Sequence, residues 1–198
     1  ETPIVPGVGI VCSGRGTQSW AEPDHPSSVA PGKRPRLTPN PALAFKNGQL
    51  HMPFGTPSGD VQTQAMLQVF LNINVFGMAP QEAVEAPRFA TYNFPGSFQP
   101  HAYFPGRLQI ENTISSSVSD ALEALGHKVF RWDDMTPRAG SVCTIVNDRK
   151  HGVLHGGADP RRALPLAERG GVLPHGAGDQ DRGAVQCARR ERALAERD

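Results

Sequence analysis

Hydrophobic residues in the first part of the chain come in short runs that turn residues interrupt. Residues 7–12 form a partly β-branched run bounded by glycine, which predicts a buried strand. Residues 42–45 and 49–54 flank Lys-Asn-Gly at 46–48, and the Asn-Gly pair predicts a tight hairpin between two strands. Three further runs predict strands at residues 128–132, 141–147 and 152–154.

Three segments have the pattern of helices. The longest runs from residue 61 to about 76 and ends at Gly77; it is apolar on nearly all sides, which predicts a helix packed between two layers. The second covers residues 80–86 and ends before Pro87, and the third covers 117–125 with Gly126 as its stop. Hairpin-joined strands with buried helices favour a layered sheet-and-helix sandwich over a parallel βαβ fold.

Composition divides the chain just after Arg162. Residues 163–198 hold 12 charged residues out of 36 but no Phe, Tyr, Trp or Ile, so this segment has little to bury. Such a composition predicts a disordered or loosely attached tail. Residues 1–162 are then expected to form one domain, since a chain of this size can bury a real core.

Charge and cysteine usage exclude several classes of function. The 20 basic and 19 acidic residues are interspersed, which argues against a nucleic-acid partner. No apolar stretch approaches the roughly 20 residues that cross a bilayer, and no signal sequence opens the chain, so no membrane role is expected and the compartment stays open. Cys12, Cys143 and Cys187 form no CxxC pair, which predicts buried thiols rather than a disulfide framework or a zinc site.

A glycine-rich loop is the first candidate for chemistry. Gly-Thr-Pro-Ser-Gly-Asp at residues 55–60 lies between a predicted strand and a predicted helix, where free backbone N–H groups and the helix dipole favour negative charge. The loop could therefore hold a phosphate or the oxyanion of an acyl-transfer intermediate. A Walker lysine and a GxGxxG motif are both missing, which argues against phosphate. A helix-capping turn with Asp60 in the first helical turn is the simpler alternative.

Two further groups of polar residues are candidates for ligand binding. Arg15 and Gln18 lie in a Gly-rich turn after the first predicted strand, where loops often carry binding residues, and an Arg fork suits a carboxylate. The alternative is that Arg15 is an ordinary surface arginine with no role in binding. His151 and His155 have a spacing that could share a metal, but without a third ligand solvated surface histidines are favoured.

Four segments, taken in order, resemble one family of enzymes, the gamma-glutamyltranspeptidases. They are residues 30–41, 55–62, 76–89 and 156–162, and the resemblance extends over residues 1–162. It implies an α+β fold, the αββα four-layer sandwich of the N-terminal-nucleophile hydrolases. It also implies a precursor that cleaves itself into a large and a small subunit, with this chain matching the small one.

The resemblance implies a mechanism as well. In the family, the N-terminal Thr of the small subunit attacks an amide carbonyl and its own α-amine acts as the base. The family's Thr-Thr-His start does not occur in this chain, and Thr2, between Glu1 and Pro3, is a poor substitute. We therefore expect a fragment that lacks the nucleophile and the N-terminal strands. The two oxyanion glycines of the family fall on Ser58 and Gly59.

Substrate recognition departs from the glutamyl-specific members. Arg15 and Gln18 occupy the places of a Gln and an Asp, and an adjacent serine pair becomes Leu37 and Thr38. These features resemble the branch with oxamate amidohydrolase and acylase-like enzymes. They imply substrate contacts at Arg15, Gln18 and Thr38, a small amide substrate with a carboxylate near the scissile bond, no cofactor or metal, and a large-subunit partner. A non-catalytic remnant, or a binding module that keeps the fold, remains the alternative.

Overall fold

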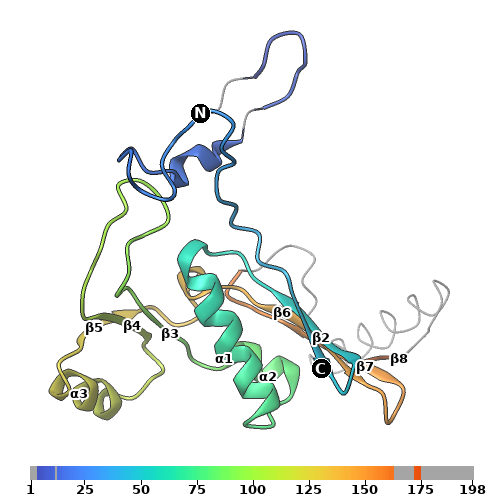
Figure 1. Cartoon of the computed structure of the whole chain (residues 1–198). Helices are drawn as coiled ribbons and strands as arrows, with labels where there is room; N and C mark the ends of the chain where they lie inside the picture. Colours follow the sequence, from blue (N-terminus) through green and yellow to red (C-terminus); the bar gives the residue numbers. More distant parts are fainter. Residues whose placement is uncertain (1–3, 12, 163–171, 175–198) are drawn as a thin grey trace, which may run out of the picture.

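The computed structural model describes residues 4–11, 13–162 and 172–174, and two sheets form its body (Figure 1). The larger sheet is antiparallel, with strand order β1-β2-β6-β7-β8. Its strands are β1 (Ala42–Lys46), β2 (Gln49–Gly55), β6 (Cys143–Asp148), β7 (Val153–Ala158) and β8 (Val172–Pro174). β8 lies within the segment that composition predicts as a tail. The remainder of that segment lies outside the described residues, so the tail stays a prediction.

The hairpin between β1 and β2 confirms the turn that Asn-Gly predicts. Asn47 and Gly48 have φ angles of 53° and 73°, and Lys46 pairs with Gln49 across the turn. Left-handed backbone at two successive positions is what a two-residue hairpin needs, and Asn and Gly tolerate it best. The local sequence therefore sets the register at this end of the sheet, although a bulge shifts it between Ala44 and Phe45.

The smaller sheet has the order β3-β4-β5 and was only partly foreseen. It consists of β3 (Phe89–Thr91), β4 (Arg107–Glu111) and β5 (Lys128–Trp132), of which only β5 was predicted. β4 and β5 are parallel and are joined through α3 (Ser116–Ala124). The sequence favours a layered sandwich over a parallel βαβ fold, yet this sheet contains one βαβ unit, β4-α3-β5. Three-residue β3 and the polar-apolar β4 carry strand signals too weak to predict that unit.

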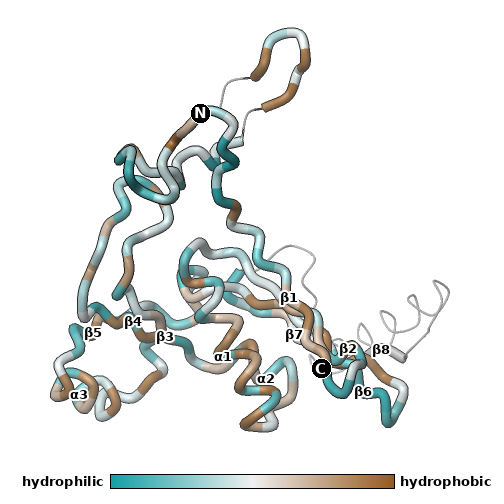
Figure 2. The backbone as a smooth tube through the Cα atoms, in the orientation of Figure 1, coloured by the Kyte–Doolittle hydropathy of each residue, from teal (hydrophilic) through white to brown (hydrophobic). Residues whose placement is uncertain are grey.

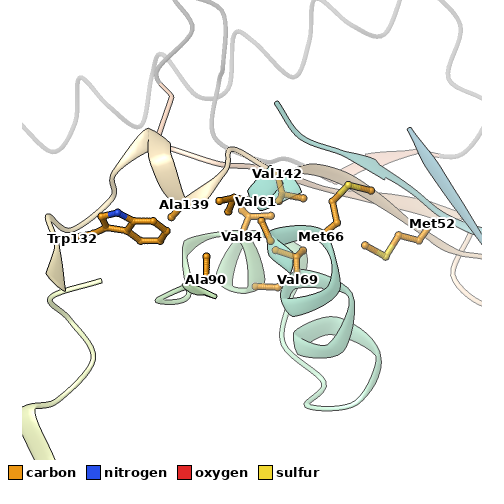
Figure 3. Packing of buried hydrophobic residues seen from close by; sticks show 11 residues of the cluster. Met52, Val61, Met66, Val69, Val84, Ala90, Trp132, Ala139 and Val142 are labelled. Carbon is orange, nitrogen blue, oxygen red and sulfur yellow. The ribbon is translucent and has the colours of Figure 1, made fainter. Parts of the chain in front are cut away.

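The core lies between the larger sheet and two helices, α1 (Gln62–Asn74) and α2 (Pro80–Glu85) (Figure 3). A short 3-10 turn, η2 (Gly59–Val61), leads into α1. α1 buries Ala65, Met66 and Val69, while Leu67 and Val75 on its other side are exposed. The expectation that α1 is covered on both sides is thus wrong for this chain. Hydrophobic colour gathers on α1, α2 and the strands of the larger sheet (Figure 2).

The first predicted strand is absent. Residues 4–11 form a turn in which the Val5 N–H donates to Ile10 O at 2.9 Å, and Ile4 and Val11 make an isolated bridge. Gly7 and Gly9 have positive φ, which breaks the extended run, and Val8 and Ile10 are exposed. A short apolar run becomes a buried strand only where neighbouring strands pair with it, and none does so among the described residues.

Four buried charged side chains connect the two sheets at their common end. Arg88, just before β3, lies 2.6 Å from Asp159, and Arg161 lies 2.5 Å from Glu111 at the end of β4. Arg161 also contacts Asp159 at 3.2 Å. All four residues are at most 3% exposed. The network therefore joins residues that are far apart in the sequence.

Backbone groups complete this network. Arg88 and Arg161 both donate to the carbonyl oxygen of Val84 in α2, at 2.8 and 2.7 Å. Burial lowers the pKa of Arg88 despite the nearby Asp159 charge. Burial acts in the same direction on Arg161, but its hydrogen bonds to Glu111 and the charge of Asp159 outweigh it, so the pKa of Arg161 is raised. Both guanidinium groups are charged, and the charges are compensated inside the fold.

A close approach explains one glycine of the same region. A Cβ atom at Gly157 in β7 would lie 2.5 Å from the carbonyl oxygen of Pro80, the first residue of α2. Only glycine permits this contact, which places the start of α2 directly on β7.

The fold is a mixed α/β body. No described helix is long and apolar enough to cross a membrane.

Candidate active site

The loop between β2 and α1 has unusual backbone geometry at the two predicted oxyanion residues. Ser58 has φ 125° and Gly59 has φ 53°. Among the described residues, no acceptor is found for the N–H group of Ser58 or of Gly59. Two successive N–H groups are thus free at the start of η2, where the helix dipole adds partial positive charge. Such a pair can hold an anion or an oxyanion.

Hydrogen bonds to a second loop hold this backbone in place. The Ser141 N–H donates to Thr56 Oγ1 at 2.7 Å, and Ser58 Oγ donates to Pro137 O at 2.8 Å. Pro137 begins η3 (Pro137–Ala139), which immediately precedes β6 in the chain. The hydroxyl of Ser58 is therefore used as a structural anchor. This anchor accounts for a serine at a position where positive φ usually favours glycine.

Asp60 connects the loop to a third segment. Its carboxylate accepts hydrogen bonds from the Ser97 N–H at 2.8 Å and from Ser97 Oγ. Ser58 is the N-cap of η2 and makes no side-chain cap bond, so the simple helix-capping reading gains no support from its side chain. Phe98 lies next to Ser97, and its ring is 4.0 Å from where a Cβ atom of Gly59 would be. The segment 93–105 thus rests against the candidate site.

The predicted substrate residues lie in an N-terminal arm, which we define as residues 13–40. The arm extends away from the two sheets and meets the segment 93–105 (Figure 1). The Gln99 N–H donates to Thr17 O at 3.0 Å, and the Trp20 ring stacks between His25 and His101 at 4.0 and 3.9 Å. The segment 93–105 therefore contacts both the candidate oxyanion loop and the arm.

The structure gives the three predicted substrate residues different environments. Arg15 and Gln18 lie in η1 (Gly14–Gln18), where Arg15 is half-buried and Gln18 is 1% exposed. Thr38 is half-buried further along the arm. Within the described residues, no hydrogen bond or ion pair joins any of them to Ser58 or Gly59. Among the described residues, the turn that carries Arg15 and Gln18 is connected to the loop through residues 93–105, by the Gln99 N–H at Thr17 O and by the contacts of Ser97 with Asp60.

An arginine among aromatic rings lies at the base of this connecting segment. Arg107 sits 5.3 Å from the Tyr92 ring centroid, 5.0 Å from that of Phe104 and 4.9 Å from that of Phe130. Burial raises the pKa of Tyr92, and the positive charges of Arg107 and Arg138 oppose that rise. Cation–π contacts of this kind hold both ends of the segment to the smaller sheet.

The remaining sequence candidates do not join the site. His151 Nδ1 lies 2.7 Å from Asp148 Oδ2, while His155 Nε2 is 3.7 Å away from the same oxygen. The part of the chain that the structure describes contains no group of three residues placed to hold a metal. Cys143 is a free, exposed thiol, so its predicted burial is wrong. Cys12 and Cys187 lie outside the described residues.

Sequence reasoning missed the residues that hold the site together. The sequence suggests only a helix-capping role for Asp60, and Ser97, Gln99 and His101 lie in a Pro/Gly-rich stretch that carries no periodic signal. Their partners are 37 to 82 residues away in the sequence. Arg88 lies in the segment 76–89, and Asp159 and Arg161 lie in the segment 156–162, so the family resemblance rather than a periodic pattern gave the signal for these members of the buried network.

Comparison with known proteins now places the chain in a family. The gamma-glutamyltranspeptidase family model matches residues 2–167. The chain is 31% identical over 158 residues to the oxamate amidohydrolase proenzyme of Klebsiella pneumoniae, covering 80% of this chain and 29% of the relative. The chain belongs to the gamma-glutamyltranspeptidase family, and the resemblance seen in its motifs is confirmed, including that to the acylase-like branch.

Solved structures agree with this assignment. A cephalosporin acylase from Bacillus halodurans superposes with a TM-score of 0.67 at 32% identity, covering 85% of this chain and 28% of the other. A Helicobacter pylori gamma-glutamyltranspeptidase mutant gives a TM-score of 0.63 at 25% identity, covering 80% of this chain and 84% of that chain. The chain therefore spans less than a third of the oxamate amidohydrolase proenzyme, yet it corresponds to most of one chain of a solved transpeptidase.

Proposed function

We propose that residues 1–162 form the core of the small subunit of an amide hydrolase or acyltransferase. Its nucleophile, an N-terminal Thr, would come from a segment outside these 198 residues, and a large subunit from the same precursor would be its partner. Family membership and the short share of the relatives' length support this proposal. The single observation that carries it is the pair of free N–H groups at Ser58 and Gly59.

The proposed reaction proceeds by acyl transfer. The Thr hydroxyl attacks the amide carbonyl carbon while the Thr α-amine takes the hydroxyl proton, and the carbonyl oxygen becomes an anion. The N–H groups of Ser58 and Gly59 donate to that anion. The C–N bond then breaks, the leaving amine takes the proton, and an acyl-Thr ester remains. Water, or an acceptor amine, attacks the ester and frees the Thr hydroxyl.

The proposed substrate is a small amide with a carboxylate near the scissile bond. Arg15 would pair with the carboxylate, while Gln18 and Thr38 would supply neutral hydrogen bonds. The arm that carries these residues is held to the segment 93–105, which also contacts Asp60 of the oxyanion loop. This connection supports a site assembled between the arm and the loop.

We also propose the four-layer αββα sandwich as the complete fold. α1 and α2 cover one face of the larger sheet. Leu43 and Ile145, which alternate with core-facing neighbours, are 62% and 42% exposed on the sheet. An apolar face of this kind suits a second sheet packed against it, as in a sandwich. The large subunit and the remaining strands are the proposed cover.

Substitution of Gly59 tests the proposed oxyanion site in the complete enzyme. Gly59→Val places a β-branched side chain at φ 53°, which should displace the N–H donors. We expect kcat to fall by about a hundredfold or more while KM changes little. Gly48→Val is the matched control, because Gly48 has φ 73° in the remote hairpin and open space around it. If folded Gly59→Val kept kcat within about threefold of the parent, the loop would be a structural turn only.

A further inference from the structure

One buried histidine joins the N-terminal arm to the segment 93–105. His101 is 8% exposed, and each of its ring nitrogens faces a backbone carbonyl oxygen. Nδ1 lies 2.8 Å from Gly96 O in the same segment, and Nε2 lies 3.3 Å from Ser19 O in the arm. A carbonyl oxygen only accepts hydrogen bonds, and a ring nitrogen donates only when it carries a proton. Both contacts are therefore hydrogen bonds only if the ring is doubly protonated and positively charged.

The stacked indole suits such a cation. The Trp20 ring lies parallel to the His101 ring, with 3.9 Å between the centroids and 4° between the planes. The face of an indole ring carries partial negative charge and attracts a cation. A neutral His101 would instead direct an unprotonated nitrogen at one of the two carbonyl oxygens, where the lone pairs repel each other. The second proton replaces that repulsion by a hydrogen bond.

The histidine on the other face of Trp20 is in a different state. The His25 ring stacks on Trp20 at 4.0 Å, and its Nδ1 accepts a hydrogen bond from the Ser27 N–H at 3.0 Å. A nitrogen that accepts a hydrogen bond carries no proton, so this ring is neutral. The stack therefore holds one positive charge, on His101, and no second cation repels it.

The other ionisable groups around the stack are carboxylates. Asp60 of the oxyanion loop accepts a hydrogen bond from the N–H of Ser97, whose preceding carbonyl is the one that faces His101 Nδ1. Glu22 and Asp24 lie in the turn before His25; both are exposed, and neither has an ion-pair partner among the described residues. All three charges are negative, which suits a cationic ring beside them.

We propose that His101 is a positioning residue: while the arm is docked it holds a second proton, and this proton fastens the substrate arm to the segment 93–105. Loss of the proton to water removes one of the two carbonyl bonds and leaves the Gln99 N–H at Thr17 O as a weaker connection. The docked arm binds one more proton than the released arm. Docking is therefore strongest at low pH and weakens as the pH rises through the titration of His101. The effect on catalysis rests on the proposed function, through the substrate residues in the arm.

Nitrogen NMR and amide hydrogen exchange on the full chain test the proposal without needing a nucleophile. We expect both ring nitrogens of His101 to carry protons while the arm is docked. One proton should leave in the same pH step in which the Gln99 amide loses protection, by about tenfold or more between about pH 5.5 and about pH 8.5. The Val29 amide, bonded to Trp20 O inside the arm, should stay protected, which separates release of the arm from its unfolding.

Two results would overturn the proposal. One is a docked arm in which His101 carries a single proton. The other is loss of a proton from His101 that leaves the protection of the Gln99 amide unchanged.

Variants that imitate each half of the ring sharpen the test. His101→Asn places an amide donor near the position of Nδ1 and His101→Gln near that of Nε2, so each can make only one of the two bonds. Both should lower the protection factor of the Gln99 amide about tenfold at low pH and remove its dependence on pH. His127→Asn, at an exposed histidine just before β5, is the matched control and should change neither. The parent's pH dependence in either His101 variant would overturn the proposal.

In the complete enzyme this contact should act on KM rather than on kcat. His101→Asn should raise KM for acidic substrates several fold, because the arm that carries Arg15 is docked less often, while kcat stays within about twofold of the parent. An unchanged KM would overturn the role of His101 in positioning the arm. A large kcat loss in Gly59→Val beside such a result would leave the proposed function standing. Coincident release of the proton and the arm, with no kcat loss in Gly59→Val, would reject the proposed function alone.

Discussion

The common end of the two sheets and the N-terminal arm are held by different means. At the sheet ends, Arg88, Glu111, Asp159 and Arg161 form a closed, buried network with backbone carbonyls as additional partners. The arm is held by stacked rings and a few hydrogen bonds to residues 93–105, and its cations are unpaired among the described residues. The first arrangement fixes the fold, while the second leaves charged groups available for a ligand.

The largest effect should come from opening the buried network. Arg161→Met leaves Glu111 and Asp159 buried without their main partner, so we expect a loss of about 3–5 kcal/mol in the free energy of unfolding. Arg162→Met is the control, because the neighbouring Arg162 is exposed and should change stability by less than about 0.5 kcal/mol. Urea unfolding followed by circular dichroism measures both. Equal losses of unfolding free energy in the two variants would mean that the buried network does not stabilise the fold.

A smaller effect, confined to specificity, is expected in the arm. In the complete enzyme, Arg15→Ala should lower kcat/KM for acidic substrates by about tenfold to a hundredfold, because a charge-assisted hydrogen bond is lost. Neutral analogues of the same size should be nearly unaffected. Steady-state measurement of kcat/KM for acidic and neutral substrates of the same size, in the parent and the variant, tests this prediction. A similar loss for both members of a pair would assign Arg15 a structural role.

Weakening the contact between the oxyanion loop and residues 93–105 should lower kcat by less than Arg15→Ala lowers kcat/KM for acidic substrates. Asp60→Asn keeps the side-chain shape but removes the charge that Ser97 contacts, so the oxyanion loop should become less well ordered. We expect kcat to fall by several fold, up to about tenfold, with little change in KM. Asp120→Asn, on the exposed side of α3, is the control. An Asp60→Asn enzyme with parental kcat would show that residues 93–105 do not support the loop.

The smallest effect is a titration at the base of the connecting segment. Burial raises the pKa of Tyr92, so the folded state holds this proton more tightly than the unfolded chain does. The resulting stability is fully present below the ordinary tyrosine pKa of about 10 and is lost as the pH rises through the higher folded value. Ultraviolet absorbance should detect a late phenolate signal that Tyr92→Phe removes. A Tyr92 signal at or below the ordinary value would contradict the burial.

Local signals in the sequence were enough for much of the body. The Asn47-Gly48 hairpin, the three helices and β5 follow from turn residues and periodicity that act over a few positions. The pattern failed where tertiary pairing decides, as in β3, in β4 and in residues 7–11, whose apolar run folds into a turn. A short run has no intrinsic strand structure without a neighbour.

In the candidate site, too, local features could be predicted from the sequence and contacts between distant segments could not. Ser58 and Gly59 could be proposed because strand, loop and helix are consecutive, and family resemblance supplied their role. The Asp60–Ser97 contact and the Gln99–Thr17 contact join segments far apart in the sequence, and no periodic pattern encodes such pairs.

We propose that this chain supplies the oxyanion loop and the substrate arm of an amide hydrolase whose nucleophilic Thr lies in another segment. The most direct measurement is the turnover of a chromogenic gamma-glutamyl or oxamate-type amide by the purified 198-residue chain and by the longer precursor that contains it. We expect no measurable turnover from the chain alone and turnover from the self-cleaved precursor. Hydrolysis by the chain alone would contradict the claim, and an inactive, correctly folded precursor would instead identify a non-catalytic remnant.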